Sequence, residues 1–465
     1  MSWIPAFTDK IKHPTDKIEQ PNPIVNLLKS KQAIPSPPPR PITISIVGAG
    51  QRGSGYAYYT ILEPQWAKVV AVAEPVDIRR NRMVKLYNIP EENVFKDWRE
   101  MIERPKLSDA VVIATLDDLH VEPAVAFANK KYNILLEKPM AITVEGCKKI
   151  TKAVTENEVL LHSHGHVLRY TPHNILIKSI IDSGLIGNIV NIQHMEPVGF
   201  WHFAHSYVRG NWRKEEESCF SLMTKELKCI CLAKIFKFNL QKKKISSFGN
   251  LVHFNSKNKP KEAGDAKNCL ECKIEPTCPY SAKKIYIDNC YKKGVVSWPV
   301  NVVTDIPDIE NLTNALKNGP YGRCVYECDN DVADNQVVNL EFANGSTANI
   351  TMIAYTESIC QRKTKIFGTL GEIEGDGINT IMYYNFLTRK KELLKPSEIL
   401  GVNDLGGHAG GDLALIRAFI YSIGESLFDL KDINSVHIKT GAQQTFEKKR
   451  AYKIYNSNSL RILIV

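Results

Sequence analysis

The chain has 465 residues and a formal net charge of +10 at neutral pH, with 43% hydrophobic and 24% charged residues. A chain of this length can form two or three domains with sizeable cores. Its eleven cysteines do not make a disulfide-dense scaffold, and no apolar run is long enough to span a membrane. The N-terminus carries no signal-peptide pattern, so we expect a cytoplasmic protein without a membrane partner.

Much of the positive charge comes from one lysine-rich stretch. Between residues 225 and 244 seven lysines accompany a single acid, Glu226. Such a stretch could bind a polyanion, but no nucleic-acid motif accompanies it. We therefore predict a solvated or aberrant segment and no nucleic-acid partner.

The first half of the chain divides into an arm and a predicted domain. Residues 1–41 are interpreted as a flexible arm with a stiff, proline-rich end at 35–41. In 42–165 apolar runs alternate with helical segments, which predicts a parallel sheet with crossover helices. The predicted strands are 42–47, 69–73, 110–114, 133–136 and 158–162, and the predicted helices are 54–63, 77–87, 97–103, 120–130 and 143–155.

The first predicted strand runs directly into a glycine-rich turn. Gly48, Gly50 and Gly53 form a G-x-G-x-x-G pattern between this strand and a predicted helix. The glycines permit a tight turn, close approach of a pyrophosphate and packing of the helix on the strand. The helix N-terminus then offers free N–H groups to phosphates, which predicts a dinucleotide site. An ordinary strand-to-helix turn is the alternative.

A carboxylate at the end of the second predicted strand indicates which dinucleotide binds. Glu74 lies about 20 residues beyond the glycines, where an acid can accept hydrogen bonds from both ribose hydroxyls. Because its charge would repel a 2′-phosphate, we predict NAD. Arg79 and Arg80 keep NADP open as an alternative.

Two more loops follow predicted strands, at the edge where such sheets bind ligands. One is A-T-L-D-D-L-H at residues 114–120, and the other is L-E-K-P-M-A at residues 136–141. A lysine directly after a buried strand, as Lys138 is, can hold a substrate hydroxyl and favour its alkoxide. A surface lysine before a proline turn is the alternative.

Together, the glycine loop, the A-T-x-x-x-x-H stretch and the E-K-P turn resemble the glucose–fructose oxidoreductase/inositol dehydrogenase (Gfo/Idh/MocA) family. The resemblance covers roughly residues 42–425. Residues 165–172, 196–213 and 406–412 are similar to one branch of this family. The last of these stretches, G-G-H-A-G-G-D, is also similar to NAD-dependent glycosidases.

The resemblance implies an α/β fold, with an N-terminal Rossmann domain and a C-terminal α/β domain that has an open, mostly antiparallel sheet. It implies hydride transfer between a nicotinamide and a carbon of a sugar or polyol, and a homo-oligomer. The expected cofactor-binding residues are Gly48, Gly50, Gln51, Arg52, Gly53, Glu74, Thr115, His120, Glu137 and Lys138. The expected substrate-binding residues are His166, Arg169, Trp212, Arg213 and His408.

The second half of the chain fits this architecture. We expect a substrate and oligomerisation domain over residues 166–430, followed by a divergent tail at 431–465. Several runs alternate polar and apolar residues, and Asn344-Gly345 signals a hairpin turn. The predicted strands are 188–196, 245–254, 335–343, 346–355, 363–368 and 379–387, and a helix is predicted at 411–423.

One position departs from the family pattern. The resemblance places a histidine, the usual acid/base partner of the E-K-P lysine, where this chain has Lys228. Without a group that titrates near neutrality, an alcohol oxidation loses about 10²- to 10⁴-fold in rate. Lys228 could act only with a lowered pKa, and a sequence error over 226–244 is an alternative explanation.

A loop rich in His, Trp, Tyr and Arg supplies other candidates. We hypothesise that His205 or Tyr207 lines the substrate cavity as a catalytic residue, although a single histidine is more often structural. Trp212 and Arg213 suit sugar recognition by stacking and hydrogen bonding. A loop anchored by a buried Trp is the alternative.

A cysteine cluster marks a polar, lysine-rich insertion near residues 257–330. Cys269, Cys272, Cys278 and Cys290 are candidate ligands of a structural zinc, since a C-x-x-C pair with two more thiols can bind zinc tetrahedrally. Four thiolates also suit an iron–sulfur cluster. Reduced thiols without a metal are the remaining interpretation.

The sequence therefore predicts an NAD(P)-dependent oxidoreductase with a sugar-like small-molecule substrate. Two rival functions remain. One is redox-assisted glycosidase chemistry, which residues 406–412 suggest. The other is a nucleotide-binding protein without turnover, which Lys228 suggests.

Overall fold

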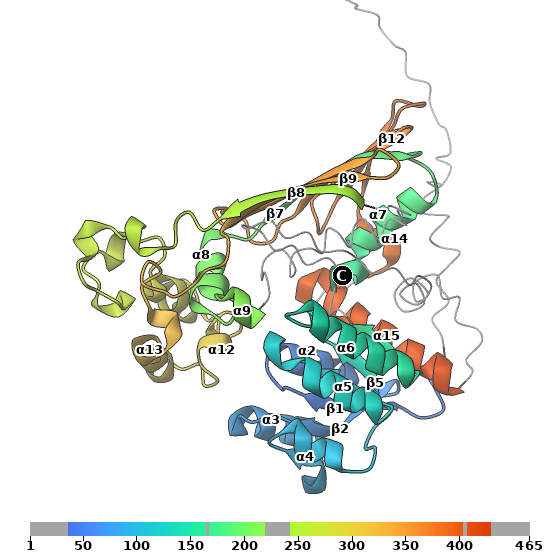
Figure 1. Ribbon diagram of the computed structural model, residues 1–465, viewed down its shortest axis with the longest axis horizontal. Helices are drawn as coiled ribbons and strands as arrows, with labels where there is room; N and C mark the ends of the chain where they lie inside the picture. Colours follow the sequence, from blue (N-terminus) through green and yellow to red (C-terminus); the bar gives the residue numbers. More distant parts are fainter. Residues whose placement is uncertain (1–35, 164–166, 219–241, 403–406, 429–465) are drawn as a thin grey trace, which may run out of the picture.

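The computed structural model describes residues 36–163, 167–218, 242–402 and 407–428. Two separate sheets dominate it, one near each end of the molecule, and a region of short helices extends to one side (Figure 1). The predicted α/β fold class is confirmed, with a parallel sheet in the N-terminal half and a mostly antiparallel sheet in the C-terminal half.

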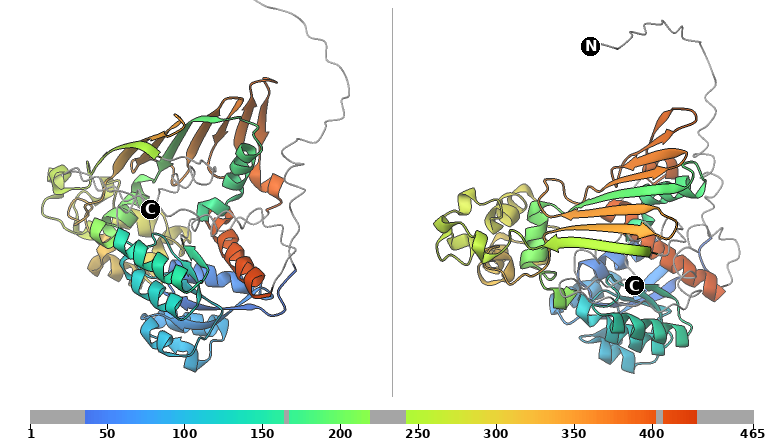
Figure 2. Two further views of the ribbon diagram at one scale, coloured as in Figure 1. Left: turned by 45° about the vertical axis from the view of Figure 1, so that its right-hand side comes forward. Right: turned by 45° about the horizontal axis from the view of Figure 1, so that its top comes forward.

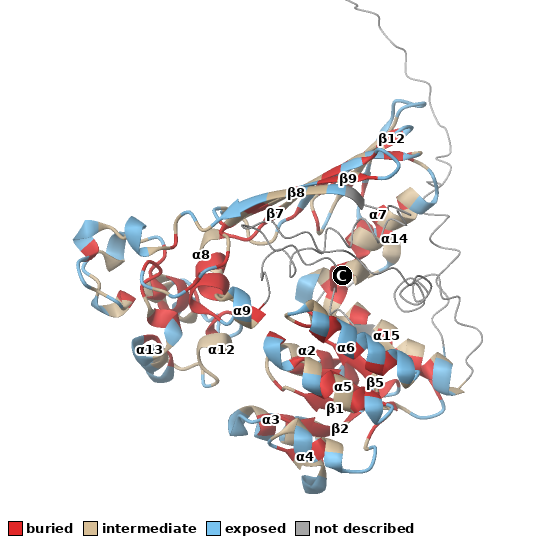
Figure 3. Ribbon diagram, in the orientation of Figure 1, coloured by how far each residue is buried: buried red, intermediate tan, exposed pale blue. Residues whose placement is uncertain are grey.

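The first sheet has six parallel strands in the order β3-β2-β1-β4-β5-β6. The strand order reverses between β1 and β4, because β2 and β3 lie on one side of β1 and β4 to β6 lie on the other. In such sheets the loops at this reversal form the ligand crevice. Its residues are buried on both faces because helices cover both (Figure 3). The strands are β1 Ile42–Val47, β2 Ala67–Ala73, β3 Val94–Phe95, β4 Ala110–Ile113, β5 Asn133–Leu136 and β6 Leu161–Ser163.

The crossover helices lie close to their predicted positions. Asp97 and Thr143 cap α4 and α6 by accepting hydrogen bonds from the backbone N–H of Arg99 and Gly146. Helix α2 begins at Gln51, three residues before its predicted start at 54. The helices are α2 Gln51–Leu62, α3 Asp77–Tyr87, α4 Trp98–Glu103, α5 Val121–Asn129 and α6 Val144–Glu156.

Helix α15, Gly411–Phe428, returns from the second half of the chain to the first sheet's domain. Its buried residues, which include Leu415 and Phe419, join one apolar cluster with Tyr59 and Trp66. Trp66 also packs on Tyr421, with ring centroids 4.2 Å apart. The packing of α15 on α2 thus brings residues just before and within α15 next to the glycine turn.

The second sheet has eight strands in the order β14-β13-β12-β11-β7-β10-β9-β8. Only β7 and β10 pair in parallel. The predicted hairpin joins β9 and β10, and Gly345 adopts the positive φ of +84° that this turn requires. The strands are β7 Ile189–Pro197, β8 Lys242–Asn250, β9 Asn335–Phe342, β10 Thr347–Ile353, β11 Lys363–Gly368, β12 Gly371–Gly375, β13 Ile381–Asn385 and β14 Lys391–Leu394.

One face of this sheet carries the domain's core. Helices α7, Pro172–Asp182, and α14, Pro396–Leu400, pack on it through residues such as Ile177 and Ile399. No described helix covers the other face (Figure 2), where Phe248 has 70% of its surface exposed. The expected homo-oligomer stays a prediction.

Short helices make up most of the remaining chain. Their own apolar cluster contains Tyr286, Leu312 and Leu316. These helices include α8 Phe200–Phe203, the π-helix η4 Ala204–Arg209, α9 Glu215–Ser218, η5 Ser256–Asn258, η6 Lys261–Ala263, η7 Cys269–Glu271, η8 Glu275–Thr277, the π-helix η9 Lys283–Asp288, η10 Tyr291–Lys293, α12 Val300–Val303, α13 Ile309–Asn318 and η11 Pro320–Gly322.

Several predictions concern residues outside the described ranges. These are most of the N-terminal arm, His166, Lys228 with its neighbours up to 241, Gly406 and the tail after 428. Among the described helices, none is both long enough and apolar enough to cross a membrane.

Candidate active site

The glycine turn has the three features that its spacing predicts. Gly48 has a φ of +89°, and a methyl group there would lie 2.7 Å from the carbonyl oxygen of Ala114. A methyl group at Gly53 would lie 1.9 Å from the carbonyl oxygen of Gly48, so the helix can pack here only without a side chain. Gly50 differs, because the nearest atom to a Cβ there, Nη1 of Arg79, is 4.0 Å away. The turn is therefore tight on two sides and open at Gly50.

The N-terminus of α2 faces this open space, and no residue of the helix balances the positive end of its dipole. No side chain caps the helix, and its first turn contains no acid. Its first backbone N–H groups therefore remain available, and the positive end of the helix dipole favours an anion. The arrangement suits a pyrophosphate.

Glu74 lies next to the turn, at the end of β2. Its carboxylate accepts hydrogen bonds from the backbone N–H groups of Ala49 at 2.6 Å and Val76 at 3.0 Å. Only 4% of its surface is exposed. Each oxygen retains a further lone pair, so Glu74 can still accept a hydrogen bond from a hydroxyl group.

The two arginines that kept NADP open are both engaged within the protein. Arg79 pairs with Asp305 at 2.8 Å. Arg80 is buried, donates to the carbonyl oxygen of Glu74 at 2.6 Å and pairs with Asp77. A 2′-phosphate would have to compete with these partners.

Residues of the E-K-P turn and of α2 form one hydrogen-bonded group. Nε of Arg52 and the hydroxyl of Tyr56 both donate to Oε1 of Glu137, at 2.7 and 2.5 Å. The other oxygen, Oε2, accepts from the backbone N–H of Lys138 at 2.9 Å. Burial favours the neutral acid, but the charges of Arg52 and Lys138 and these hydrogen bonds outweigh it and lower the pKa of Glu137 to about 2.

Arg52 also connects this group to the distant end of the chain. Its Nη1 donates to Asp412 at 2.9 Å, and Asp412 pairs with Nδ1 of His408 at 2.9 Å. Asp412 is the second residue of α15 and belongs to the G-G-H-A-G-G-D stretch. Sequence reasoning missed Tyr56 and Asp412 as members of the site, although Asp412 lies in a stretch already singled out by resemblance.

His120 joins the two loops that follow β4 and β5. Its side chain is fully buried, with Nδ1 2.7 Å from the carbonyl oxygen of Pro139 and Nε2 3.3 Å from that of Thr115. A neutral ring can donate to only one of these carbonyls at a time. His120 therefore positions the loops and is shielded from the crevice, whereas Thr115 is half-buried.

Lys138 is half-buried beside an aromatic ring. Its Nζ lies 5.3 Å from the ring centroid of Trp212, within the range of a cation–π contact. Within the described residues, this ammonium group has no hydrogen bond or ion pair. The chain after Trp212 continues into α9, which packs beside η2, Asp117–Leu119. Trp212 thus lies at the crevice between the two loops.

The insertion of short helices reaches the glycine turn. Gln51 and Asn301, which belongs to α12, exchange two hydrogen bonds of 3.4 Å each. The pair of Arg79 with Asp305 lies nearby in the chain. The cofactor crevice is therefore bordered by the insertion as well as by the parallel sheet.

Comparison with known proteins identifies this crevice. A family model described as an oxidoreductase family with an NAD-binding Rossmann fold matches residues 42–164. The family concerned is Gfo/Idh/MocA, and the match spans the domain of the first sheet. The predicted resemblance is confirmed.

Individual relatives match at different lengths. An inositol 2-dehydrogenase of Salmonella paratyphi B is 31% identical over 142 residues, which cover 30% of this chain and 42% of that protein. The match thus spans less than half of that relative. The putative oxidoreductase YteT of Bacillus subtilis is 23% identical over 359 residues, or 73% of this chain and 77% of that protein.

Solved structures share the whole architecture. A levoglucosan dehydrogenase in complex with NADH and levoglucosan has a TM-score of 0.59 and 18% identity, and the match covers 83% of this chain and 90% of that chain. At this identity the similarity shows the fold. The second domain therefore shares its fold with that structure as well.

The two catalytic candidates in the aromatic loop lie in packed surroundings. His205 is 2% exposed, and its Nδ1 is 2.8 Å from the hydroxyl of Tyr286. It also stacks on Tyr321. Burial, with smaller effects from His202 and Arg209, lowers the pKa of His205 to about 3. His205 is therefore buried against the insertion, and its role toward a substrate stays a prediction.

Tyr207 is buried too, but it is closer to the crevice. Its ring stacks on Phe203, with centroids 5.2 Å apart, and lies 5.5 Å from that of Trp212. Only 2% of its surface is exposed. Tyr207 therefore supports Trp212 from behind, and direct contact with a substrate stays a prediction.

The remaining substrate candidates divide similarly. Arg213 pairs with Asp329 at 3.0 Å and Glu217 at 3.5 Å, so it anchors the loop to the insertion. Arg169 is half-buried in the short helix η3, Val167–Tyr170. His408 is exposed near the Arg52 group, with 44% of its side-chain surface accessible. Their roles toward a substrate stay predictions.

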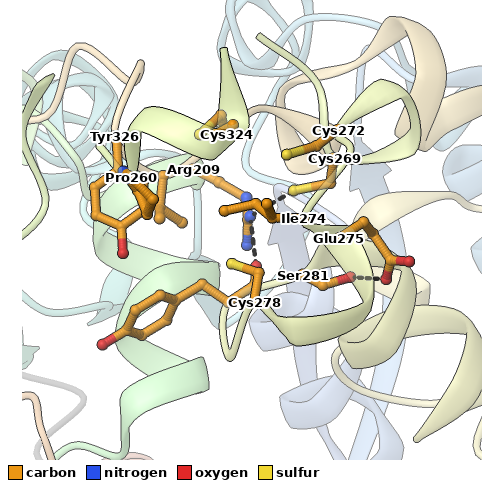
Figure 4. A pocket seen from close by; sticks show the side chains of 13 residues that line it. Arg209, Pro260, Cys269, Cys272, Ile274, Glu275, Cys278, Ser281, Cys324 and Tyr326 are labelled. Atoms are coloured by element: carbon orange, nitrogen blue, oxygen red, sulfur yellow. Dashed lines mark hydrogen bonds between the residues drawn. The ribbon is translucent and has the colours of Figure 1, made fainter. Parts of the chain in front are cut away.

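The cysteines group differently from the prediction. Cys269, Cys272 and Cys278 line one pocket, as expected, but the fourth thiol of this pocket is Cys324 (Figure 4). Cys290 does not line it and lies in the apolar cluster of the insertion. No group of three described His, Cys, Asp or Glu side chains has the geometry to hold a metal ion, so the expected structural zinc is not supported.

Proposed function

We propose that this protein is an NAD-dependent oxidoreductase that transfers hydride between nicotinamide and a hydroxyl-bearing carbon of a sugar or polyol. The observation that carries the proposal is the open side of the glycine turn at Gly50, where the uncapped N-terminus of α2 faces free space. The match of residues 42–164 to the model of the Gfo/Idh/MocA family supports it. So do relatives described as inositol 2-dehydrogenase and levoglucosan dehydrogenase.

The residues present fit a dinucleotide. A pyrophosphate would lie against Gly50 and the first N–H groups of α2, where no side chain intrudes. Glu74 would accept hydrogen bonds from ribose hydroxyls through its remaining lone pairs. Because Arg79 and Arg80 already pair with acids, we infer NAD rather than NADP. Bound NAD supplies the hydride acceptor for an alcohol.

Lys138 is the residue that we assign to the reacting hydroxyl. Its ammonium group lies just after β5 and beside the Trp212 ring, and it makes no hydrogen bond or ion pair with the described residues. A fixed cation at this point stabilises an alkoxide as the hydroxyl loses its proton. The face of Trp212 offers an apolar surface against which a sugar ring can pack.

The proton acceptor is not assigned. His205 is buried and neutral, and its partner is Tyr286. Lys228 lies outside the described residues. The glycosidase alternative receives no specific support, because Asp412 pairs with Arg52 and His408 pairs with Asp412. A protein that binds NAD without turnover remains the rival that an experiment must separate.

Two measurements test the proposal. Titration of the protein with NAD, followed by tryptophan fluorescence, should give a saturable change. NADH formation with a panel of polyols, aldoses and anhydrosugars should then reveal a substrate. Replacement of Lys138 by Ala should leave NAD binding unchanged and reduce kcat by about 10²- to 10⁴-fold. Lys149→Ala, at an exposed site on α6, is the matched control and should change neither.

The outcomes are distinct. If no saturable NAD binding is found, both the dinucleotide site at the glycine turn and the proposed function are wrong. NAD binding without turnover across the panel would favour the non-catalytic rival. Full activity in Lys138→Ala would remove Lys138 from the mechanism and leave the cofactor assignment in place.

A further inference from the structure

The insertion contains a pocket whose walls come from separate parts of the chain and carry four thiols (Figure 4). Cys269 begins η7 and Cys272 follows it, Cys278 follows η8, and Cys324 comes from the segment after η11. The space in and around the pocket, including the part that is open to solvent, is about 350 Å³. Apolar side chains, among them Ile274, complete much of its lining.

The backbone holds these segments in place. Asn268 and Arg323 form an isolated antiparallel bridge, and the N–H of Cys324 donates to the carbonyl oxygen of Lys267 at 2.8 Å. Cys269 and Cys324 therefore follow directly from two paired positions. Residues some 55 positions apart in the sequence are brought together by the fold rather than by local spacing.

A buried cation lies in the wall of this pocket. Arg209 is 1% exposed, and its Nη2 donates to the sulfur of Cys269 at 3.3 Å and to the carbonyl oxygen of Tyr280 at 2.8 Å. Its Nε donates to the carbonyl oxygen of Arg323 at 2.7 Å. Its Nη1 is buried and has no hydrogen-bond partner in the described part of the chain.

The pocket does not supply a countercharge to this guanidinium. Its one acid, Glu275, accepts a hydrogen bond from Ser281 at 2.5 Å and lies 3.7 Å from Nζ of Lys283. An arginine stays charged in a protein, and a buried charge without a partner is costly. Glu275 is thus engaged with Ser281 and Lys283, and the four thiols are the other lining groups that can become negatively charged.

The region around the pocket contains little regular secondary structure. From residue 256 to 293 the chain consists of short helical turns, η5 to η10, joined by loops. The eight described cysteines are all free, so no disulfide reinforces this region. Small regions with little regular structure commonly depend on a bound metal for rigidity.

The geometry distinguishes a cluster from a single ion. A structural zinc requires four ligands that converge on one atom, with Zn–S distances of about 2.3 Å. No described group of three ligating side chains does so. In a cubane iron–sulfur cluster each thiolate binds a different iron atom, and the thiolates remain apart around an inorganic core. Four thiols that share a pocket without converging on one point match the second case.

We propose that Cys269, Cys272, Cys278 and Cys324 bind a [4Fe–4S] cluster and that Arg209 balances its negative charge. The free Nη1 of Arg209 then donates to a sulfur atom of the cluster or of a ligand, as Nη2 already does to Cys269. The C-x-x-C pair and the Cys-Pro step at Cys278 also occur in the ligand runs of bacterial ferredoxins.

The position of the cluster gives it a structural role toward the crevice. Arg209 ends the π-helix η4, which also carries His205 and Tyr207, and Tyr207 contacts Trp212. The same insertion contacts Gln51 through Asn301. Loss of the cluster should therefore loosen the wall of the crevice that Trp212 and the insertion form.

Chemical analysis of the full chain tests the proposal. The protein is expressed in a host that assembles iron–sulfur clusters and purified without oxygen. We expect iron and acid-labile sulfide in equal amounts, about four of each per chain, with a broad visible absorption band. Cys324→Ser should lose most of the sulfide. Cys290→Ser is the matched control, since its thiol lies outside the pocket, and should retain it.

Other results would overturn the inference. Zinc in place of iron would do so, as would protein that carries no sulfide even after reconstitution with ferrous iron and sulfide. Loss of the cluster from Cys290→Ser with retention in Cys324→Ser would refute the ligand set. Should Cys324→Ser fail to fold, iron, sulfide and Mössbauer analysis of the unaltered protein decide alone. NAD titration of the same sample reports separately on the proposed function.

Discussion

Two arginines near the crevice differ in how their charge is balanced. Arg52 is paired by the chain itself, with Glu137 at 2.7 Å and Asp412 at 2.9 Å. Arg209 is the more deeply buried of the two, yet its three acceptors among the described residues are two carbonyl oxygens and one thiol sulfur. Burial without a countercharge is the more costly state.

This difference in charge balance indicates that Arg52 and Arg209 have different roles. Arg52 links the glycine helix, the E-K-P turn and α15, and its acceptors are complete in the folded chain. Its task is to fix the relative positions of these elements. Arg209 has a buried donor, Nη1, without a hydrogen-bond partner in the described part of the chain, and the proposed cluster would balance its charge.

The largest expected effect follows from breaking the Arg52 group. Arg52→Met leaves Glu137 and Asp412 without their shared cation, and both carboxylates are poorly exposed. Because Arg52 itself keeps about 31% of its side-chain surface in solvent, we expect a loss near the lower end of the range for buried pairs, about 3 kcal/mol. Urea unfolding of the two proteins measures it.

A surface pair provides the control. Arg99 pairs with Asp97 and Glu122, all of them largely exposed, and Arg99→Met should cost less than about 1 kcal/mol. Equal costs at Arg52 and Arg99 would mean that the Arg52 group is no more than a solvated contact, and the contrast with Arg209 would disappear.

The same group predicts an acid-sensitive stability. The pKa of Glu137 is about 2 in the folded protein against an ordinary value of 4.5. A carboxylate with a lowered pKa stabilises the fold fully above its unfolded pKa, and this contribution is lost as pH falls from about 4.5 to about 2. The contribution amounts to about 3 kcal/mol. The free energy of unfolding should therefore fall across this interval.

The Glu137→Gln variant tests whether Glu137 causes this fall in the free energy of unfolding with falling pH. The amide does not titrate, so the variant should be less stable at neutral pH and should lose less stability between pH 4.5 and pH 2. An unchanged slope in the variant would assign the acid sensitivity to other carboxylates.

Helices and strands could be predicted from the sequence where the pattern that specifies them lies within the segment itself. The strand at 42–47, the helix at 77–87 and the strand at 133–136 were predicted with the observed bounds, because apolar runs and turn residues lie within each segment. Helix α2 was started late because Gly53 and Gly55 look like turn residues. Strands β12 and β14 were missed, since G-E-I-E-G and K-E-L-L are short and polar.

Contacts between segments that are distant in the chain could not be predicted from the sequence. The identity of the fourth pocket thiol depends on the bridge between Asn268 and Arg323, and Cys290 was nearer in the chain than Cys324. The burial of His205 depends on Tyr286 and Tyr321, which come from the insertion. The link from Arg52 to Asp412 spans 360 positions. None of these leaves a periodic or spaced pattern in the sequence.

The contrast extends from side chains to the backbone, because the N-terminus of α2 is also left without an internal partner for its charge. Gly50 and Gly55 separate the two roles that a glycine can have there. Gly55 lies inside α2 with no atom within 4 Å of the place that an added methyl group would take, so Gly55→Ala should stabilise the protein by about 0.5–1 kcal/mol and leave NAD binding unchanged. Gly50 has φ and ψ of −69° and −162°, which alanine adopts without strain.

Gly50→Ala should therefore fold as well as the unaltered protein and yet bind NAD at least tenfold more weakly, because its methyl group enters the space where the backbone would approach a pyrophosphate. Thermal unfolding without ligand and fluorescence titration with NAD measure the two quantities on the same samples. Equal NAD affinity in the Gly50 and Gly55 variants would show that the phosphates do not lie against this turn. The open charge at α2 would then be balanced by solvent alone, in contrast to the thiol-lined pocket of Arg209.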